Sequence, residues 1–488
     1  MISRRGLIGA GLAAGAGWLP LQSAPRTTDL ADLGLLEASA LLRRGEVSPV
    51  ELTRACLARI EARNPQLNAF LTVTADQALT DARRAEAELP RRPRGPLHGI
   101  PLALKDNIDT AGTRTTAAAA AFAERVPGED AEVTRRLREA GAILLGKLNM
   151  DECAYGISST SGHFGAVRNP WSAGHVAGGS SGGPAAAVAA RLCYAALGTD
   201  TGGSIRQPAA WCGITGLKPT YGLVSCRGVM PLSWSLDHVG PMCRSAADTA
   251  AVLDVLAGFD DRDSASIEAP RVDYAAALRN PAAPLRLGRP ATGYFDGLDP
   301  EIEAAVAAAM EMLGSLSAGW REVDLPPVPA LSILFVEAHA YLAPQRERSP
   351  DGFSPGVRAL IDMGGRIPAA SYAEALRELA RTRRQVRRVF ADVDLIVTPT
   401  TPDLPMTQAE ALAPPVRRGP PPSARNTTPF NIYGLPTVSV CCGFTRSGLP
   451  IGLQISGPPL ADAAVLTLAH AYQQQTDWHL RYPPLRAA

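Results

Sequence analysis

The sequence predicts an α/β fold built as one large domain. Amphipathic helical patterns alternate with short apolar runs, such as AGAILLGK at residues 140–147 and DLIVT at residues 394–398. Uninterrupted apolar runs of this length are typical of strands that are buried on both faces. The 488 residues are 46% hydrophobic and 19% charged, which is enough to bury a large core. No internal repeat and no clear domain boundary divides the chain.

The first half of the chain should begin with helices. Residues 30–63 are expected to form two helices, the second opened by Ser48 as N-cap and Pro49 at the first helical position. A longer helix is expected at about residues 74–89. Residues 97–105 then alternate turn and strand signals and lead to Lys105. Helices interspersed with buried strands in this way favour the α/β class.

The composition changes from about residue 165 onward. Residues 165–240 are rich in glycine, and residues 270–390 are mostly helical in pattern, with a short strand near Leu285. The proline-rich stretch 402–424 should be an irregular surface loop, and loops of this kind often flank a pocket. The expected C-terminal elements are a strand pair and a closing helix, at residues 435–443, 448–456 and 463–475.

The charge balance excludes several partners. The chain has 48 basic and 47 acidic residues, so nothing favours binding to nucleic acid or to an anionic membrane. The arginine-rich stretch at residues 381–388 carries apolar residues at helical spacing and is expected to be the solvated face of an amphipathic helix.

The eight cysteines do not indicate a metal site. They contain no CxxC pair and no ligand-like spacing with histidine, and they are too few for a disulfide scaffold. Most are expected to be buried thiols. No metal and no cofactor is therefore expected.

Residues 1–25 are predicted to be a targeting segment outside the fold. Arg4 and Arg5 form a twin arginine, an apolar run from Leu7 to Leu19 follows, and small or polar residues continue to Pro25. This pattern resembles a twin-arginine export signal. The apolar run is shorter than the ~20 residues that span a bilayer. We therefore expect residues 26–488 to form the functional domain, periplasmic or secreted, or cytoplasmic if the segment is not a signal. An uncleaved anchor is the other interpretation of the segment.

Lysine is rare in this chain. Only Lys105, Lys147 and Lys218 occur, whereas 45 of the 48 basic residues are arginines. Arginine stays charged, but a buried lysine can release its proton and act as a base. Lys147 and Lys218 are expected to have structural roles. Lys105 becomes a candidate base because two Ser-Gly clusters follow it.

Those two clusters have the composition of an oxyanion-binding loop. The first is GGSSGG, which begins at Gly178 and leads into an alanine-rich helix near Pro184; the second is GTDTGGSIR, from Gly198 to Arg206. Glycine permits backbone conformations that are closed to other residues, so consecutive N–H groups can converge on one oxygen. Two such clusters downstream of a rare lysine indicate a lysine-activated serine hydrolase.

These motifs resemble those of the amidase signature family. The blocks GGSSGG, GTDTGGSIRQP, CGITGLKPTYG and LALKDNI all look like that family's motifs, and the spacing agrees. The resemblance covers about residues 30–485 and includes FNIYGLPTVSV and GLPIGLQISG. It implies a single α/β/α domain in which helices flank a central mixed β-sheet. It also implies an amidase, which hydrolyses a linear amide C–N bond through an acyl-enzyme.

The resemblance also implies roles for individual residues. Ser204 would be the nucleophile, Ser180 the bridging serine after a cis peptide bond, and Lys105 the base. Residues bracing the loop would be Asp200, Arg206 and Ser181. Backbone N–H groups forming the oxyanion hole would be those of Thr201, Gly202, Gly203 and Ser204.

The physics of lysine agrees with this assignment. At its ordinary pKa of ~10.4, lysine is neutral in only about one molecule in 2500 at pH 7. Burial can lower that pKa by up to ~3–5 units. A buried Lys105 could then take the Ser204 proton through Ser180 and return it to the leaving amine.

The sequence departs from the family's usual pattern in two places. Pro184 replaces a small residue after GGSSGG, which a helix start accepts. The segment GISSTSGHFG at residues 156–165 lacks an asparagine that is often present there. Because this segment is expected to line the pocket, the substrate is not predicted; amides, carbamates and esters all stay open.

Three other functions compete with this interpretation. GxSxG patterns around Ser180 and Ser181 could belong to a Ser-His-Asp hydrolase, but no strand is expected before them. A glutamine-hydrolysing amidotransferase subunit would share the same triad, although an export signal argues against it. A catalytically inactive binding protein is disfavoured because all three triad residues are present. The expected partner is a small-molecule amide, with no nucleic acid and no stable membrane anchor; a homodimer stays open.

Overall fold

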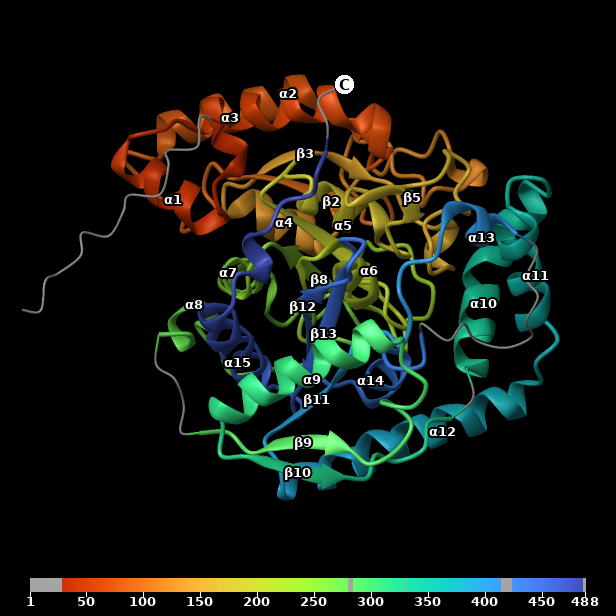
Figure 1. Ribbon diagram of the computed structural model, residues 1–488. Helices are drawn as coiled ribbons and strands as arrows, with labels where there is room; N and C mark the ends of the chain where they lie inside the picture. Colours follow the sequence, from red (N-terminus) through yellow and green to blue (C-terminus); the bar gives the residue numbers. More distant parts are fainter. Residues whose placement is uncertain (1–28, 280–283, 330, 414–423, 486–488) are drawn as a thin grey trace, which may run out of the picture.

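The computed structural model describes residues 29–279, 284–329, 331–413 and 424–485. These residues form an α/β structure around one large sheet, as the sequence predicts (Figure 1). The predicted signal at residues 1–25 lies outside the described residues. Among the described residues, no helix has both the length and the apolar character needed to cross a membrane.

The sheet is mixed and has eleven strands in the described residues. Its order is β1-β3-β2-β6-β8-β7-β12-β13-β11-β9-β10. The pairs β3–β2, β2–β6, β11–β9 and β9–β10 are parallel, and the other neighbours are antiparallel. The bounds are β1 Phe70–Val73, β2 Pro101–Lys105, β3 Ile143–Leu148, β6 Ala195–Asp200, β7 Thr215–Lys218, β8 His238–Cys243, β9 Leu287–Pro290, β10 Trp320–Val323, β11 Leu395–Pro399, β12 Thr437–Phe444 and β13 Pro450–Ser456. A separate hairpin consists of β4 Arg168–Asn169 and β5 Ser172–Val176.

The helices surround this sheet. Figure 1 shows α1–α3 above one end of the sheet, α9 and α15 across its centre, and α10–α12 beside it. The helix bounds are α1 Leu35–Arg44, α2 Pro49–Leu67, α3 Ala75–Glu88, α4 Glu132–Glu139, α5 Gly182–Ala189, α6 Arg206–Cys212, α7 Ala246–Leu256, α8 Tyr274–Ala277, α9 Pro300–Ser315, α10 Ser332–Arg348, α11 Pro355–Gly364, α12 Ala369–Gln385, α13 Gln408–Leu412, α14 Thr428–Tyr433 and α15 Asp462–Gln475. Short 3₁₀ turns occupy Leu30–Asp32, Ala120–Phe122, Glu152–Ala154, Val386–Ala391 and Trp478–Leu480.

Local signals in the sequence account for several of these elements. The Ser48 hydroxyl accepts a hydrogen bond from the Glu51 N–H, and Pro49 occupies the first turn of α2, as expected. The apolar runs form β3 and β11, whose residues are all buried. The strand pair β12–β13 and the helix α15 also lie where the sequence predicts them.

Two expectations need correction. Besides the strand expected near Leu285, residues 270–390 contain the edge strand β10, whose partly exposed residues give no apolar run. The proline-rich stretch 402–424 is also not wholly irregular, because α13 lies within it and is opened by a capping box at Thr407.

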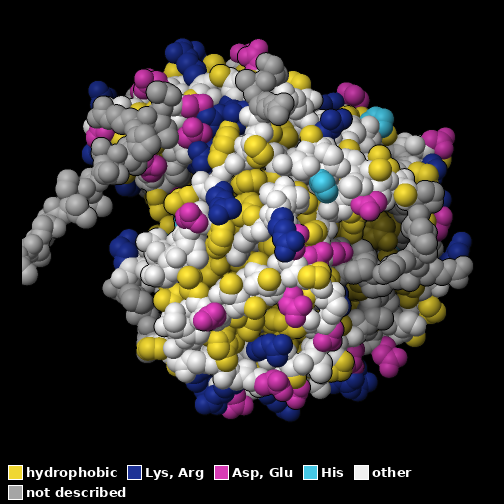
Figure 2. Space-filling view, viewed as in Figure 1, with side chains coloured by type: hydrophobic (Ala, Val, Ile, Leu, Met, Phe, Trp, Pro, Cys, Tyr) yellow, Lys and Arg dark blue, Asp and Glu magenta, His cyan; other side chains and the backbone are white. Residues whose placement is uncertain are grey.

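The cysteines and the surface charges agree with the composition. All eight cysteines are free thiols, and seven of them are buried, with Cys226 half-buried. On the face shown in Figure 2, basic and acidic side chains are interspersed rather than gathered by sign. That face therefore presents no single-sign field of the kind that attracts a polyanion.

Candidate active site

Lys105 is held at the end of a central strand. It is the last residue of β2, which lies between β3 and β6, and its side chain is fully buried. Its Nζ lies 2.8 Å from Ser180 Oγ and 2.8 Å from Thr199 Oγ1, with the Thr199 carbonyl oxygen 3.4 Å away. A neutral amine has two N–H groups and one lone pair. With Thr199 accepting the N–H groups, the lone pair can face the Ser180 hydroxyl.

Ser180 sits in the loop that opens α5. The Gly179–Ser180 peptide bond is cis, as the family resemblance implies. The Gly179 N–H donates to Gln207 Oε1 at 2.9 Å, and the Ser181 hydroxyl donates to the Thr199 carbonyl at 3.1 Å. These bonds tie the residues on either side of Ser180 to α6 and β6, so the loop that carries Ser180 is fixed relative to the second glycine cluster.

Asp200 and Arg206 hold the second glycine cluster, residues 198–206, in place. The Asp200 carboxylate accepts bonds from the N–H groups of Gly203 and Ile205, and Arg206 Nε and Nη2 each lie 3.0 Å from it. Burial would raise the pKa of Asp200, but the charge and hydrogen bonds of Arg206 hold it below its ordinary value. The bidentate pair is fully buried, so it fixes the turn between β6 and α6.

The predicted oxyanion hole is smaller than expected. Gly203 donates its N–H to Asp200 Oδ1 at 2.8 Å, so this group is already used within the loop. Among the described residues, the N–H groups of Thr201, Gly202 and Ser204 have no hydrogen-bond partner. These three donors, without Gly203, form the candidate oxyanion hole.

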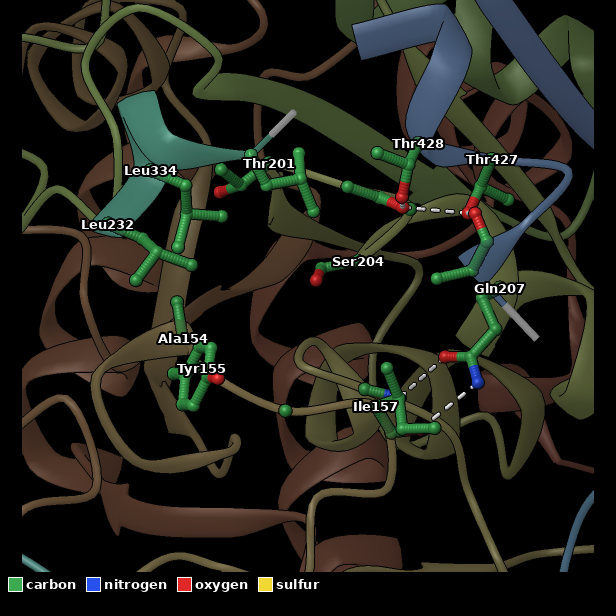
Figure 3. Close-up of a pocket in the computed structure, with 16 residues that line it drawn as sticks. Ala154, Tyr155, Ile157, Thr201, Ser204, Gln207, Leu232, Leu334, Thr427 and Thr428 are labelled. Atoms are coloured by element: carbon green, nitrogen blue, oxygen red, sulfur yellow. Dashed lines mark hydrogen bonds between the residues drawn. The ribbon is translucent and has the colours of Figure 1, made fainter. Parts of the chain in front are cut away.

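Ser204 faces a cavity of about 300 Å³. Figure 3 shows its side chain at the centre of that pocket, and 9% of the residue is exposed. Its hydroxyl makes no hydrogen bond to any described residue, including Ser180. Hydrogen bonds of this kind are often long in unliganded enzymes and shorten when substrate binds. The geometry therefore joins Lys105 to Ser180 directly and leaves Ser204 available to a ligand.

The electrostatics suit a neutral amine. Burial lowers the pKa of Lys105 to about 7, although the negative charges of Asp151, Asp200 and Asp237 oppose that shift. A pKa near neutrality is the property a general base needs. Lysine at this position can therefore be unprotonated under ordinary conditions, which arginine could not be.

The other two lysines donate hydrogen bonds to backbone carbonyl groups. Lys147 Nζ donates to the Ile108 carbonyl and to Thr115 Oγ1, the latter at 2.8 Å, and burial lowers its pKa to about 8. Lys218 Nζ donates to the carbonyls of Pro219 and Leu435. Neither touches Ser180 or Ser204, in agreement with the structural roles expected for them.

A histidine-based site finds no support in the geometry. A strand, β5, does precede the GxSxG patterns, so that objection to a Ser-His-Asp site was wrong. No histidine, however, makes a hydrogen bond with Ser180, Ser181 or Ser204 among the described residues. The buried His238 is bonded instead to the Leu236 carbonyl and to Lys218.

Several residues that hold the site are not among those predicted from the sequence. Thr199 contacts Lys105 and itself accepts a bond from Asn107 Nδ2 at 3.3 Å. Asn431 Nδ2 reaches the Asp200 carboxylate, and the Thr201 hydroxyl donates to Asp237. Thr199 and Asn107 stand inside the quoted motifs and could have been chosen as buried polar residues. Asn431 also stands inside a quoted motif, FNIYGLPTVSV, but nothing in the sequence pairs it with Asp200, just as nothing pairs Asp237 with Thr201.

The described residues contain no group of three or more His, Cys, Asp or Glu side chains placed to hold a metal ion. The donors that converge on the pocket are backbone N–H groups, a serine hydroxyl and the Lys105–Ser180 pair. This set can activate a hydroxyl and stabilise an oxyanion, which is what acyl transfer requires.

Comparisons with known proteins agree with this geometry. A family model described as Amidase matches residues 51–466. A glutamyl-tRNA(Gln) amidotransferase subunit from Methylococcus capsulatus is 44% identical, over 92% of this chain and 98% of the relative. Two solved structures, a 6-aminohexanoate cyclic dimer hydrolase and a bacterial aryl acylamidase of the amidase signature family, superpose with TM-scores of 0.85. They are 28% and 26% identical, and each match covers 93% of this chain and 99% of the other. With its fold, its motifs and most of its length matched, this chain belongs to the amidase family.

Proposed function

We propose that this protein hydrolyses carboxylic amides through an acyl-enzyme on Ser204. The observation that carries the proposal is the buried Lys105 amine, 2.8 Å from the Ser180 hydroxyl and with a pKa of about 7. A fully buried amine paired with a hydroxyl rather than a carboxylate has the environment of a base, not of an ion pair.

The reaction follows from these positions. Ser204 Oγ attacks the amide carbon while its proton moves to Ser180, whose own proton moves to neutral Lys105. The N–H groups of Thr201, Gly202 and Ser204 receive the developing oxyanion. The C–N bond then breaks, and the leaving amine takes a proton from Lys105 through Ser180. Water attacks the ester by the same relay, releases the acid and restores Ser204.

Covalent labelling tests the assignment. A fluorophosphonate added to the purified protein should modify Ser204, as mapped by mass spectrometry, and the label should disappear in Lys105→Ala. Val126→Ala, a change at an exposed position outside the pocket, should label like the unaltered protein. A label on Ser180 or Ser181, or one that survives the loss of Lys105, would refute the triad.

A second candidate function is that of an ammonia-supplying subunit of a tRNA-dependent amidotransferase. The supporting observation is the 44% identity with a curated amidotransferase subunit over nearly its whole length. In this role the same triad would act on glutamine, and a partner subunit would use the ammonia. The twin-arginine pattern of residues 1–25 conflicts with this function, because charged tRNA is found in the cytosol.

The two candidates predict different substrates. A stand-alone amidase should release ammonia or amine from simple amides without any partner. An amidotransferase component should hydrolyse glutamine better than simple amides, and more strongly once its partner is present. Ammonia release by the purified chain alone, with glutamine and with a simple primary amide, separates them.

A further inference from the structure

The pocket around Ser204 is built from two unlike walls. Figure 3 shows Leu232, Leu334, Ala154 and Tyr155 on one side of Ser204, with Thr427, Thr428 and Gln207 on the other. The apolar side combines the loop after β7, the helix α10 and the 3₁₀ turn at Glu152–Ala154. Aliphatic and aromatic residues that line the cavity are Ala154, Tyr155, Ile157, Leu232, Leu331, Leu334 and Ala424.

No described residue that lines the cavity carries a charge. Apart from Ser204 and Tyr155, the polar side chains there are already hydrogen-bonded to the protein. Thr427 and Thr428 both donate to the Gly202 carbonyl, at 2.7 and 3.0 Å. Gln207 accepts from the Gly179 N–H and donates to the Ile157 carbonyl at 3.1 Å. The two threonine hydroxyls have thus given up their single donor hydrogen, and none of these uncharged side chains can neutralise a charged ligand.

Two further carboxylates next to the cavity lining are also occupied, as Asp200 is. Asp237 accepts the Thr201 hydroxyl and the N–H groups of Leu232 and Ser233. Asp151 accepts from the Ser158 N–H and the Ser161 hydroxyl, and it lies behind the backbone of Gly179. Neither presents a free oxygen that could bind an ammonium group in the cavity.

Besides the proposed nucleophile Ser204, Tyr155 is the lining residue whose polar group is unused in the described structure. Its hydroxyl has no hydrogen-bond partner in the described part of the chain, and burial raises its pKa, so it stays neutral at ordinary pH. An aromatic ring with an unused neutral hydroxyl can stack on an aryl or alkyl group and donate one hydrogen bond. It cannot compensate a buried charge.

We infer that this pocket selects an uncharged amide with an aromatic or branched aliphatic group beside the scissile bond, recognised by Leu232, Leu334 and Tyr155. The inference rests on the proposed function, whose reaction it specifies. Free glutamine carries an ammonium and a carboxylate three carbons from its amide. Burying such groups without partners is costly, so glutamine should be a poor substrate despite the similarity to amidotransferase subunits.

Three primary amides of comparable reach test this inference in the unaltered protein: 3-phenylpropanamide, butanamide and L-glutamine. Ammonia release should give a kcat/KM for 3-phenylpropanamide about 10–100 times that for butanamide, because the ring buries additional apolar surface. Glutamine should fall below butanamide. A kcat/KM for glutamine equal to or above that for 3-phenylpropanamide would overturn the inference.

Failure of the inference and failure of the proposed function give different results. If Ser204 reacts with the fluorophosphonate but glutamine is the best amide, the triad stands and the apolar selection is wrong. If Ser204 is unlabelled and none of the three amides is hydrolysed, the proposed function itself is wrong.

A substitution of Leu334 tests whether the apolar side of the pocket is responsible for the preference for 3-phenylpropanamide. Leu334→Ala should raise KM for 3-phenylpropanamide and lower its kcat/KM by about tenfold, while butanamide changes less than about threefold. Val126→Ala removes a comparable side chain from an exposed position outside the pocket and should change neither. An equal loss on both amides with Leu334→Ala would show a general structural effect and contradict the assignment. If the Leu334→Ala protein does not fold, the ratios of kcat/KM among the three amides in the unaltered protein still test the inferred selectivity.

Discussion

At the scale of single residues, the protonation state of Lys105 determines how the activity should depend on pH. This side chain has no exposed surface, and its hydrogen-bond partners are the hydroxyls of Ser180 and Thr199 and the Thr199 carbonyl. Because burial lowers its pKa to about 7, the amine is protonated below that pH and neutral above it. The neutral form is the one that can accept a proton from Ser180.

Amide hydrolysis should therefore rise with pH and level off above about pH 8. The logarithm of kcat/KM measured from pH 5 to 9 should show one ascending limb centred near pH 7. Lys105→Arg keeps its proton and should lose at least about 1000-fold in kcat/KM at pH 8. A flat profile, or a Lys105→Arg protein with a tenth of the activity, would exclude Lys105 as the base.

The position of Ser180 depends on the absence of a side chain at Gly179. A Cβ there would lie 2.1 Å from Asp151 Oδ2 and 2.7 Å from the Ser158 N atom. Gly179→Ala must therefore displace the loop, and a shift of about 1 Å can cost about 100-fold in rate. Gly174→Ala, where a Cβ meets nothing within 4 Å, is the matched control and should keep full activity. Equal kcat values for the two variants would contradict this account.

At the scale of elements, Glu337 joins α10 to the loop that carries Leu232 and Asp237. This fully buried carboxylate accepts bonds from the Ser233 and Ser235 hydroxyls, the Ser235 N–H and the Tyr372 hydroxyl. Through these bonds one side chain sets the spacing between α10, α12 and the loop. The apolar wall of the pocket, with Leu334 on α10, depends on that spacing.

Glu337→Gln should weaken this junction. The amide nitrogen cannot accept a hydrogen bond, so at least one buried donor is left unpaired, at a cost of about 2–3 kcal/mol in the free energy of unfolding. KM for 3-phenylpropanamide should rise more than kcat falls. Glu347→Gln changes an exposed residue of the same helix and should leave both quantities unaltered. Urea unfolding that shows no difference between the two variants would remove Glu337 from this role.

Elements with strong local signals could be predicted, and contacts between distant segments could not. The capped helix α2 and the apolar strands β3 and β11 follow from short stretches of sequence, whereas β10 has half-exposed residues and no comparable pattern. Lys105, Ser180 and Ser204 follow from motifs. The bonding of Glu337 to Ser233 and Ser235, and of Asn431 to Asp200, joins residues more than 100 positions apart. No spacing rule reaches that far. The use of the Gly203 N–H by Asp200 is likewise a matter of three-dimensional loop geometry.

At the scale of the whole molecule, export and catalysis should be separable. The described structure begins at Asp29, and all residues assigned to the site lie beyond it. Changing Arg4 and Arg5 together to lysine should abolish periplasmic accumulation in a host with twin-arginine transport, measured by fractionation and immunoblotting. The purified double variant should keep its kcat/KM. Equal distribution of both proteins between the fractions would show that residues 1–25 are not such a signal.

The three lysines have a consequence for the chemistry of the intact surface. Lys105, Lys147 and Lys218 are 0%, 1% and 0% exposed, and the chain has no other lysine. A succinimidyl ester should therefore find no reactive ε-amine on the folded protein, apart from the amine at the amino terminus. Acylation of the lysines then reports global or local opening. The rate of acylation in denaturant measures the rate at which the buried lysines become exposed by unfolding. Amine-selective coupling resins should capture the native molecule only through its terminus, so immobilisation would present every copy in one orientation.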